Sequence, residues 1–166
     1  DLPAELLEAH ASRNLAFFVG AGASMDAPSD LPSFRQLARD LAMAARVSFD
    51  EDAAIDYFLG SMPADFDTHR HARDLIARPQ STFNATHSAI VRLAAAFGAP
   101  RIVTTNFDDH LRAAAVSESL PIADMWVGPA LPLGENFTGL VHLHGSVERD
   151  PSELVLTDRD FGRAYL

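Results

Sequence analysis

Three short apolar runs predict strands. Residues 15–19 (LAFFV) form an uninterrupted run, residues 101–105 (RIVTT) are β-branched, and residues 140–143 (LVHL) form a further short run. An uninterrupted run such as 15–19 is typical of a strand that is buried on both faces of a parallel sheet. Each run stops at a cluster of small or polar residues, so each strand is expected to end there.

Apolar residues at helical spacing predict helices between these strands. Ser33 and Gln36 have the spacing of a capping box, and Ile90, Leu93, Ala94 and Phe97 should share one helix face. Residues 25–32 read as a loop. The expected helices lie at residues 3–12, 33–41, two within 50–78 divided near residues 60–63, 81–97, from Asp108 to Ala115, and from about Asp158 onward.

Strands that alternate with helices predict an α/β fold. The expected architecture is Rossmann-like, with a doubly wound parallel sheet and helices on both faces. Ligands of such sheets bind at the carboxyl ends of the strands. The polar clusters at residues 20–24, 104–109 and 142–146 all follow predicted strands. We therefore expect them to share one crevice within a single domain, residues 1–166.

Composition indicates a soluble globular protein rather than a membrane or disordered one. Hydrophobic residues make up 48% of the chain and charged residues 22%. No apolar run approaches the roughly 18 residues that a membrane span needs. The acidic N-terminal segment lacks the cationic start of a secretory signal. We expect a cytoplasmic protein with no membrane partner.

Charge and cysteine content exclude several kinds of partner. The formal net charge is −10, and all 13 basic residues are arginine. Such a surface repels a phosphate backbone, so no direct nucleic-acid partner is expected, although backbone N–H groups can still hold a small anionic cofactor. The chain has no cysteine. Disulfides, thiolate nucleophiles and cysteine-based zinc sites are therefore excluded, and no zinc is expected.

The first polar cluster, residues 20–24 (GAGAS), is suited to phosphate binding. Small residues after a buried strand let the backbone approach a pyrophosphate. The dinucleotide fingerprint is incomplete, because Met25 stands where its third glycine should be. No acidic ribose-binding residue is evident about 20 positions on, so a standard nicotinamide dehydrogenase fits poorly. The alternative is a tight strand-to-helix turn without a ligand.

The second cluster, residues 104–109 (TTNFDD), places Asn106 just past a strand. Its amide can donate and accept hydrogen bonds, which suits holding a ribose hydroxyl or a water. The alternative is structural: Asn106 and Asp108 would end the strand and cap the next helix.

The third cluster, residues 142–146 (HLHGS), carries two histidines that period-2 geometry places on one face. His144 precedes Gly145 and is suited to proton transfer near neutral pH. His142 is interpreted as a hydrogen-bonded, partly buried side chain. Alternatively, both histidines could bind a metal together with Asp108 or Asp109. No role is assigned to the five other histidines: His10, His69, His71, His87 and His110.

In this order the motifs GAGAS, LPSFR, TTNFD and LHGS resemble the sirtuin superfamily. The resemblance runs from about residue 15 to residue 146. It is nearest to the divergent sirtuin-like domains of bacterial defence proteins that deplete NAD⁺. Such a domain normally continues with further strands, so we expect the polypeptide to extend beyond Leu166, where a sensor domain could lie.

The resemblance implies a role for each matching residue. His144 would be the base or ribose contact at the reacting centre, and Asn106 would position a ribose hydroxyl or a water there. Phe34 and Arg35 would flank the nicotinamide ribose and the pyrophosphate. The residues implied in binding the phosphates, ribose and carboxamide of NAD⁺ are Gly20, Ala21, Gly22, Ser24, Thr105, Asp108, Gly145 and Ser146.

Departures from the family narrow the expected activity. Sirtuin deacylases usually carry a four-cysteine zinc module after the HG element, and this chain has no cysteine. The expected function is hydrolysis of NAD⁺ to nicotinamide and ADP-ribose, as the effector of a bacterial defence system and in a homo-oligomer or with a partner domain. The alternatives are a non-catalytic NAD⁺ or ADP-ribose sensor, a deacylase or ADP-ribosyltransferase, and the metal-dependent hydrolase.

Overall fold

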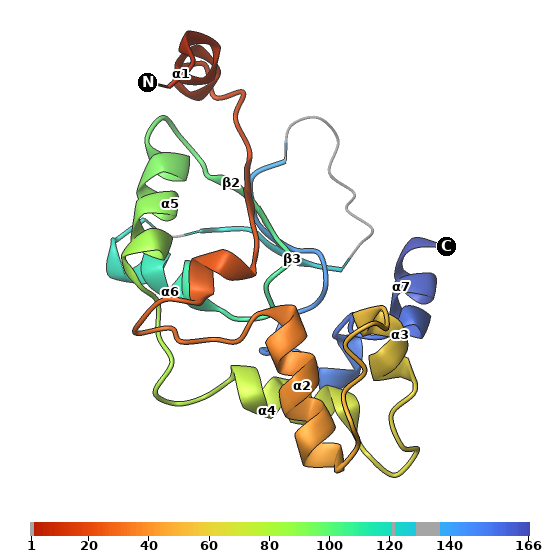
Figure 1. Ribbon diagram of the computed structural model, residues 1–166. Helices are drawn as coiled ribbons and strands as arrows, with labels where there is room; N and C mark the ends of the chain where they lie inside the picture. Colours follow the sequence, from red (N-terminus) through yellow and green to blue (C-terminus); the bar gives the residue numbers. More distant parts are fainter. Residues whose placement is uncertain (1, 121, 129–136) are drawn as a thin grey trace.

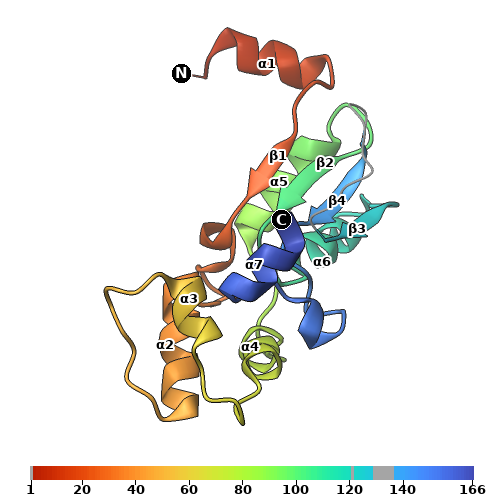
Figure 2. The same ribbon diagram turned by 90° about the vertical axis from the view of Figure 1, so that its right-hand side faces the viewer.

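A computed structural model describes residues 2–120, 122–128 and 137–166. Its centre is a four-stranded sheet (Figure 1). The strand order is β1-β2-β4-β3, as Figure 2 shows, and every pairing is parallel. The strands are β1 (Phe17–Val19), β2 (Arg101–Thr104), β3 (Met125–Val127) and β4 (Gly139–His142). The expected α/β class with a parallel sheet is confirmed.

The helices form groups that lie at different places around the sheet. They are α1 (Ala4–Ala11), η1 (Ala21–Ser24), α2 (Phe34–Ala45), α3 (Ile55–Gly60), α4 (Thr68–Ile76), α5 (Ala85–Ala95), α6 (His110–Ser117), η2 (Pro151–Glu153) and α7 (Asp158–Tyr165). Helices α5 and α6 lie beside the sheet, and α1 stands apart at one end. Helices α2, α3, α4 and α7 gather at the other end, toward which β1 runs (Figure 2).

Two apolar cores stabilise these groups. The sheet core contains Val19, Val91, Ile102, Leu111, Ala114, Ala115 and Leu140. The second core joins α2, α3 and α4 to the segment around η2, with Leu41, Leu59 and Leu156 almost completely buried. Each fully buried side chain of this kind contributes roughly 1.5–3 kcal/mol relative to an exposed one. The helical group is thereby fixed at the carboxyl ends of the strands.

Two expectations about buried faces were wrong in part. Phe18 is 69% exposed, because the sheet core packs only on the face of β1 that carries Phe17 and Val19. On α5 the buried residues are His87 and Val91, and Ile90 and Ala94 of the expected face are partly buried beside them. Leu93 is 51% exposed, and Phe97, beyond the end of the helix, is 45% exposed. The stripe that faces the sheet core therefore includes a polar residue, His87, that the apolar pattern does not mark.

The predicted start of α2 is confirmed in part. Ser33 Oγ accepts a hydrogen bond from the backbone N–H of Gln36 at 3.2 Å. The Gln36 amide donates to Asp40 Oδ1 at 2.8 Å instead of completing the capping box.

Among the described residues, no helix combines the length and apolar character that a membrane crossing requires.

Candidate functional site

The three polar clusters meet at one cavity of about 220 Å³, as the strand ends predict. Parallel pairing aligns Val19 with Thr104, and Thr104 with His142, so these strands end at one edge of the sheet. The predicted site residues that line the cavity are Ala21, Ser24, Phe34, Thr105, Asn106, Asp108 and His144. The structure thus brings these seven together, and what they bind or catalyse stays a prediction.

Ser24 is the centre of a buried hydrogen-bond network beside the cavity. Its hydroxyl donates to Asp108 Oδ2 at 2.9 Å and accepts from Asn106 Nδ2 at 3.1 Å. The ring of His87 lies on the same hydroxyl, with Nε2 at 3.0 Å. One donor and two acceptor positions of the hydroxyl are therefore all used. The network holds Asn106 and Asp108 in fixed orientations.

His87 was given no role from the sequence, and the structure places it in this network. The backbone N–H of Asn84 donates to its Nδ1 at 3.1 Å, so Nε2 carries the ring hydrogen and donates to Ser24. Burial lowers the pKa of His87, while the carboxylate of Asp108 raises it and nearby His110 lowers it. The ring is therefore neutral. The spacing Asn84-x-x-His87 is that of a capping box, and this spacing could have indicated from the sequence that His87 has a structural role.

The same geometry does not make Ser24 the nucleophile of a serine–histidine pair. In such a pair the histidine accepts the serine proton. Here His87 presents a hydrogen to Ser24, and the hydroxyl hydrogen points to Asp108. Ser24 is consequently a structural hub of the site.

Asn106 is held by its backbone as well as by its side chain. Its N–H donates to Thr104 Oγ1 at 3.0 Å, and its carbonyl accepts from His142 Nδ1 at 3.1 Å. Its side-chain Oδ1 is buried and has no hydrogen-bond partner among the described residues. An unpartnered buried acceptor costs about 1–3 kcal/mol. A ligand that donates to this oxygen would recover that cost.

The two histidines of the third cluster have different surroundings. His142 is completely buried and orients Asn106 through the bond from Nδ1, which fits its interpretation as a hydrogen-bonded structural side chain. Burial lowers its pKa, and the bond to Asn106 raises it. Within the described ranges, no three histidine or acidic side chains are arranged to hold a metal ion.

His144 is half-buried and lines the cavity. Burial lowers its pKa, so the ring is neutral at pH 7 and can accept a proton. Its ring lies edge-on to Phe161 with centroids 5.2 Å apart, and to Tyr165 at 6.2 Å. Both aromatic residues belong to α7. Phe161 also lines the cavity, and the sequence pattern gave no indication of this.

Gly145 and Ser146 are placed behind the cavity rather than in its lining. Gly145 has a φ of +94°, and a Cβ there would lie 2.6 Å from the carbonyl oxygen of Glu153. Ser146 is buried, and its Oγ accepts from the N–H of Glu148 at 3.3 Å. Both residues shape the turn that carries His144.

The remaining predicted contacts, Gly20, Gly22 and Arg35, are not among the residues that line the cavity. Gly20 has an extended backbone, and a Cβ at Gly22 would meet no heavy atom within 4 Å, so the backbone there is open to approach. The Arg35 guanidinium contacts the carbonyl of Glu51 at 3.1 Å and its carboxylate at 3.4 Å. Arg35 does not line the cavity. A role in pyrophosphate binding would require it to leave Glu51.

Comparison with known proteins gives two matches. The family described as "SIR2-like domain" matches residues 100–166, a region that includes Asn106, Asp108, His144 and α7. A protein of Sinorhizobium fredii, named "Uncharacterized protein y4cA", is 34% identical over 194 aligned residues. That alignment covers 100% of this chain and 16% of the relative. The chain therefore spans about a sixth of that relative's length, and it is similar to a SIR2-like domain over the part that ends in α7.

Proposed function

We propose that this chain binds NAD⁺ and hydrolyses its nicotinamide–ribose bond, giving nicotinamide and ADP-ribose. The observation that carries the proposal is the buried Oδ1 of Asn106, which has no hydrogen-bond partner in the described part of the chain and belongs to a residue that lines the same cavity as His144. Both residues lie in the region similar to a SIR2-like domain. The order of the motifs GAGAS, LPSFR, TTNFD and LHGS supports the same ligand.

The cavity fits the nicotinamide–ribose half of the molecule. Its volume of about 220 Å³ lies below the roughly 300–1,000 Å³ of sites that enclose a whole ligand. Leu31, Phe34 and Phe161 supply apolar walls for a planar ring, and Asn106 and Asp108 supply acceptors for hydroxyl groups. The phosphates would lie along η1, where the first N–H groups of the turn lack partners within it and the backbone at Gly22 is open.

The reaction breaks the bond between C1′ of the ribose and the nicotinamide nitrogen. The electron pair leaves with nicotinamide, and the ribose passes through an oxocarbenium-like state. A water whose hydrogen is accepted by Asn106 Oδ1 attacks C1′, and its proton passes to neutral His144. General-base catalysis of this kind contributes roughly 10²–10⁴-fold in rate.

Hydrolysis is the outcome that the residues at the cavity support. Asn106 Oδ1 can accept a hydrogen from a water, and neutral His144 can accept its proton. We therefore place water as the acceptor of the ADP-ribosyl group.

In the cell, we propose that this activity depletes NAD⁺ as the effector of a bacterial defence system. The proposal comes from the resemblance to sirtuin-like domains of that type. The effector would act as a homo-oligomer or under the control of an attached domain. Measurement of NAD⁺ in bacterial cells after induction of the protein, with and without phage infection, tests this role.

Product analysis tests the activity itself. We expect incubation of the protein with NAD⁺ to release nicotinamide and ADP-ribose in equal amounts. Binding of NAD⁺ in calorimetry without release of nicotinamide would instead identify a sensor. Nicotinamide in excess over ADP-ribose would identify transfer to another acceptor.

A further inference from the structure

Helix α7 forms an aromatic wall against His144. The ring of Phe161 meets that of His144 at an interplanar angle of 79°, and Tyr165 lies nearly parallel to Phe161 with centroids 6.2 Å apart. In the described part of the chain, no hydrogen bond is made by the His144 ring. Its orientation in the cavity therefore depends on packing against Phe161 and Tyr165.

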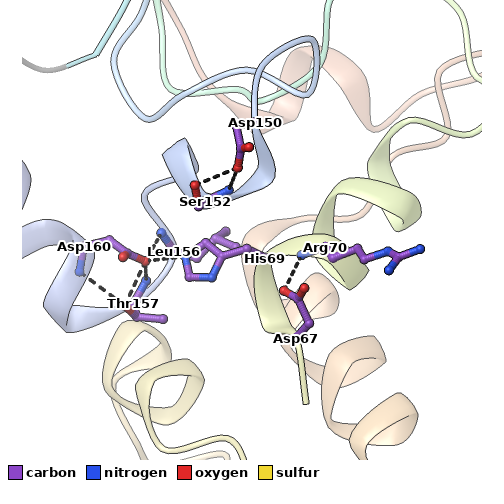
Figure 3. Close-up of polar contacts among 8 residues, drawn as sticks. All are labelled: Asp67, His69, Arg70, Asp150, Ser152, Leu156, Thr157 and Asp160. Atoms are coloured by element: carbon purple, nitrogen blue, oxygen red, sulfur yellow. Dashed lines mark hydrogen bonds and ion pairs between the residues drawn. The ribbon is translucent and has the colours of Figure 1, made fainter. Parts of the chain in front are cut away.

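None of the residues of α7 is buried, so apolar packing alone does not hold the helix. Its position depends on the hydrogen bonds at its N-terminal end. Asp160 Oδ2 accepts from Thr157 Oγ1 at 2.8 Å and from the N–H groups of Thr157 at 2.9 Å and Leu156 at 3.2 Å. Thr157 Oγ1 accepts from the N–H of Asp160 at 3.2 Å. Figure 3 shows these bonds around one carboxylate.

One side chain from another helix reaches the same carboxylate. His69 Nε2 of α4 lies 2.8 Å from Asp160 Oδ2, and the two side chains are 24% and 11% exposed (Figure 3). Asp67 caps α4 by accepting from the N–H of Arg70 at 3.0 Å, which fixes the turn that carries His69. Since Asp160 directly precedes Phe161, this contact fixes α7 where the aromatic wall begins.

We propose that Phe161 is a positioning residue for His144, and that the His69–Asp160 contact between α4 and α7 holds Phe161 in place. The catalytic part of this inference rests on the proposed function. His69 acts on His144 through Asp160 and Phe161, and it does not line the cavity. Loss of its ring should therefore displace His144 without removing any group that meets the substrate.

The test uses three variants on α4. His69→Ala removes the contact, and His69→Gln keeps a donor near the position of Nε2. His71→Ala is the matched control, because His71 lies on the same helix, is exposed, and bonds to the carbonyl of Asp67 instead. A fourth variant, Phe161→Leu, keeps an apolar side chain and removes the ring that faces His144.

The first readout is independent of activity and follows the His144 ring by NMR. In His69→Ala and Phe161→Leu, we expect the ring protons to lose part of the shift caused by the neighbouring aromatic rings. The pKa of His144 should rise toward its ordinary value, because water gains access to the ring. Tyr165 on α7 contacts its ring and Asp108 lines the same cavity, and all four variants retain both titratable groups.

The second readout is the rate of nicotinamide release. We expect kcat to fall by roughly tenfold to a hundredfold in His69→Ala, with a smaller change in KM, because displacement by about 1 Å is sufficient for such a loss. His69→Gln should recover most of kcat, and His71→Ala should match the unaltered protein.

The two readouts separate the inference from the proposed function. Unchanged His144 resonances and an unchanged His144 pKa in folded His69→Ala would overturn the inference. Shifted resonances in a protein that releases no nicotinamide would uphold the positioning of His144 and reject the function. If His69→Ala fails to fold, the pKa of His144 in Phe161→Leu decides, since loss of the packing should raise it, and an unchanged pKa would overturn the inference.

Discussion

Two glycines in the predicted binding motifs, Gly145 and Gly22, have different structural reasons for lacking a side chain. Gly145 has a left-handed backbone and leaves no room for a Cβ beside Glu153. Gly22 has free space around it and no unusual φ. The first glycine is therefore required by the fold, and the second is available for the approach of a ligand.

Replacement of Gly145 by alanine should lower the free energy of unfolding by about 1–3 kcal/mol, through backbone strain and the contact with the Glu153 carbonyl. Urea denaturation monitored by circular dichroism measures the change. An unchanged urea midpoint would show that the turn adjusts at no cost.

For Gly22→Ala we predict a loss of NAD⁺ affinity rather than a loss of stability. Its stability should stay within about 0.5 kcal/mol of the original, the usual range for surface changes. Affinity for NAD⁺ should fall, because the new methyl group would lie where the phosphates approach the backbone. Calorimetric titration tests this, and undiminished affinity would move the phosphates away from η1.

Individual roles could be predicted from the sequence only where a motif fixes them. The structure brings Asn106, Asp108 and His144 to one cavity, as their places after strand ends led us to expect, and their roles in binding and catalysis stay predictions. Phe161 could not be found in this way, since its contact with His144 depends on how the segment after β4 folds back. The position of the Arg35 side chain could not be predicted from the sequence either, because it depends on an ion pair with Glu51.

At the scale of elements, Asn84 links α5 to the first polar cluster. Its side chain accepts from the N–H groups of Thr86 and His87, and its amide donates to the carbonyls of Ala23 at 2.9 Å and Asp26 at 3.2 Å. One residue thus begins a helix and anchors the loop that carries Ser24.

Asn84→Ala should destabilise the protein by more than the roughly 1 kcal/mol of a lost N-cap, because the loop bonds disappear as well. Asn14→Ala is the control, since Asn14 is exposed and its amide makes only a long bond of 3.4 Å to Ser12. Equal urea midpoints for both variants would contradict the anchoring role.

Helices with caps and long apolar stripes were predictable, and short strands were less so. Strand β3 has three residues, Met125–Val127, with no distinguishing pattern, and it is defined by pairing with β4. The face that α5 turns to the sheet core was predicted only in part, because one of its buried residues is His87, a polar residue that apolar periodicity does not reveal.

For the whole molecule, three histidines resist protonation in the folded state. Burial lowers the pKa of His87, His142 and His144 below the ordinary value of 6.5. The unfolded chain binds protons at these positions once the pH falls below about 6.5, and the folded chain does so only at lower pH. The free energy of unfolding should therefore decrease as the pH falls through this window.

Urea midpoints at about pH 7.5 and about pH 5.5 measure this effect. We expect a lower midpoint at the acidic pH. His71→Gln, which alters an exposed histidine, should retain the difference. A midpoint that stays constant or rises would show that the buried rings are protonated in the folded protein.

The fold class and the meeting of three motifs follow from the order of strands and helices along the chain. The helical group at the strand ends and the fixing of α7 by His69 depend on contacts between α4 and α7 that no local pattern encodes.

The most direct test of the central claim is the rate of nicotinamide release from NAD⁺ by Asn106→Ala and His144→Ala beside the unaltered protein, with His71→Ala as control. We predict a loss of roughly 10²–10⁴-fold in each site variant, at unchanged circular dichroism, and none in the control. Nicotinamide release that persists in both folded site variants would contradict the account.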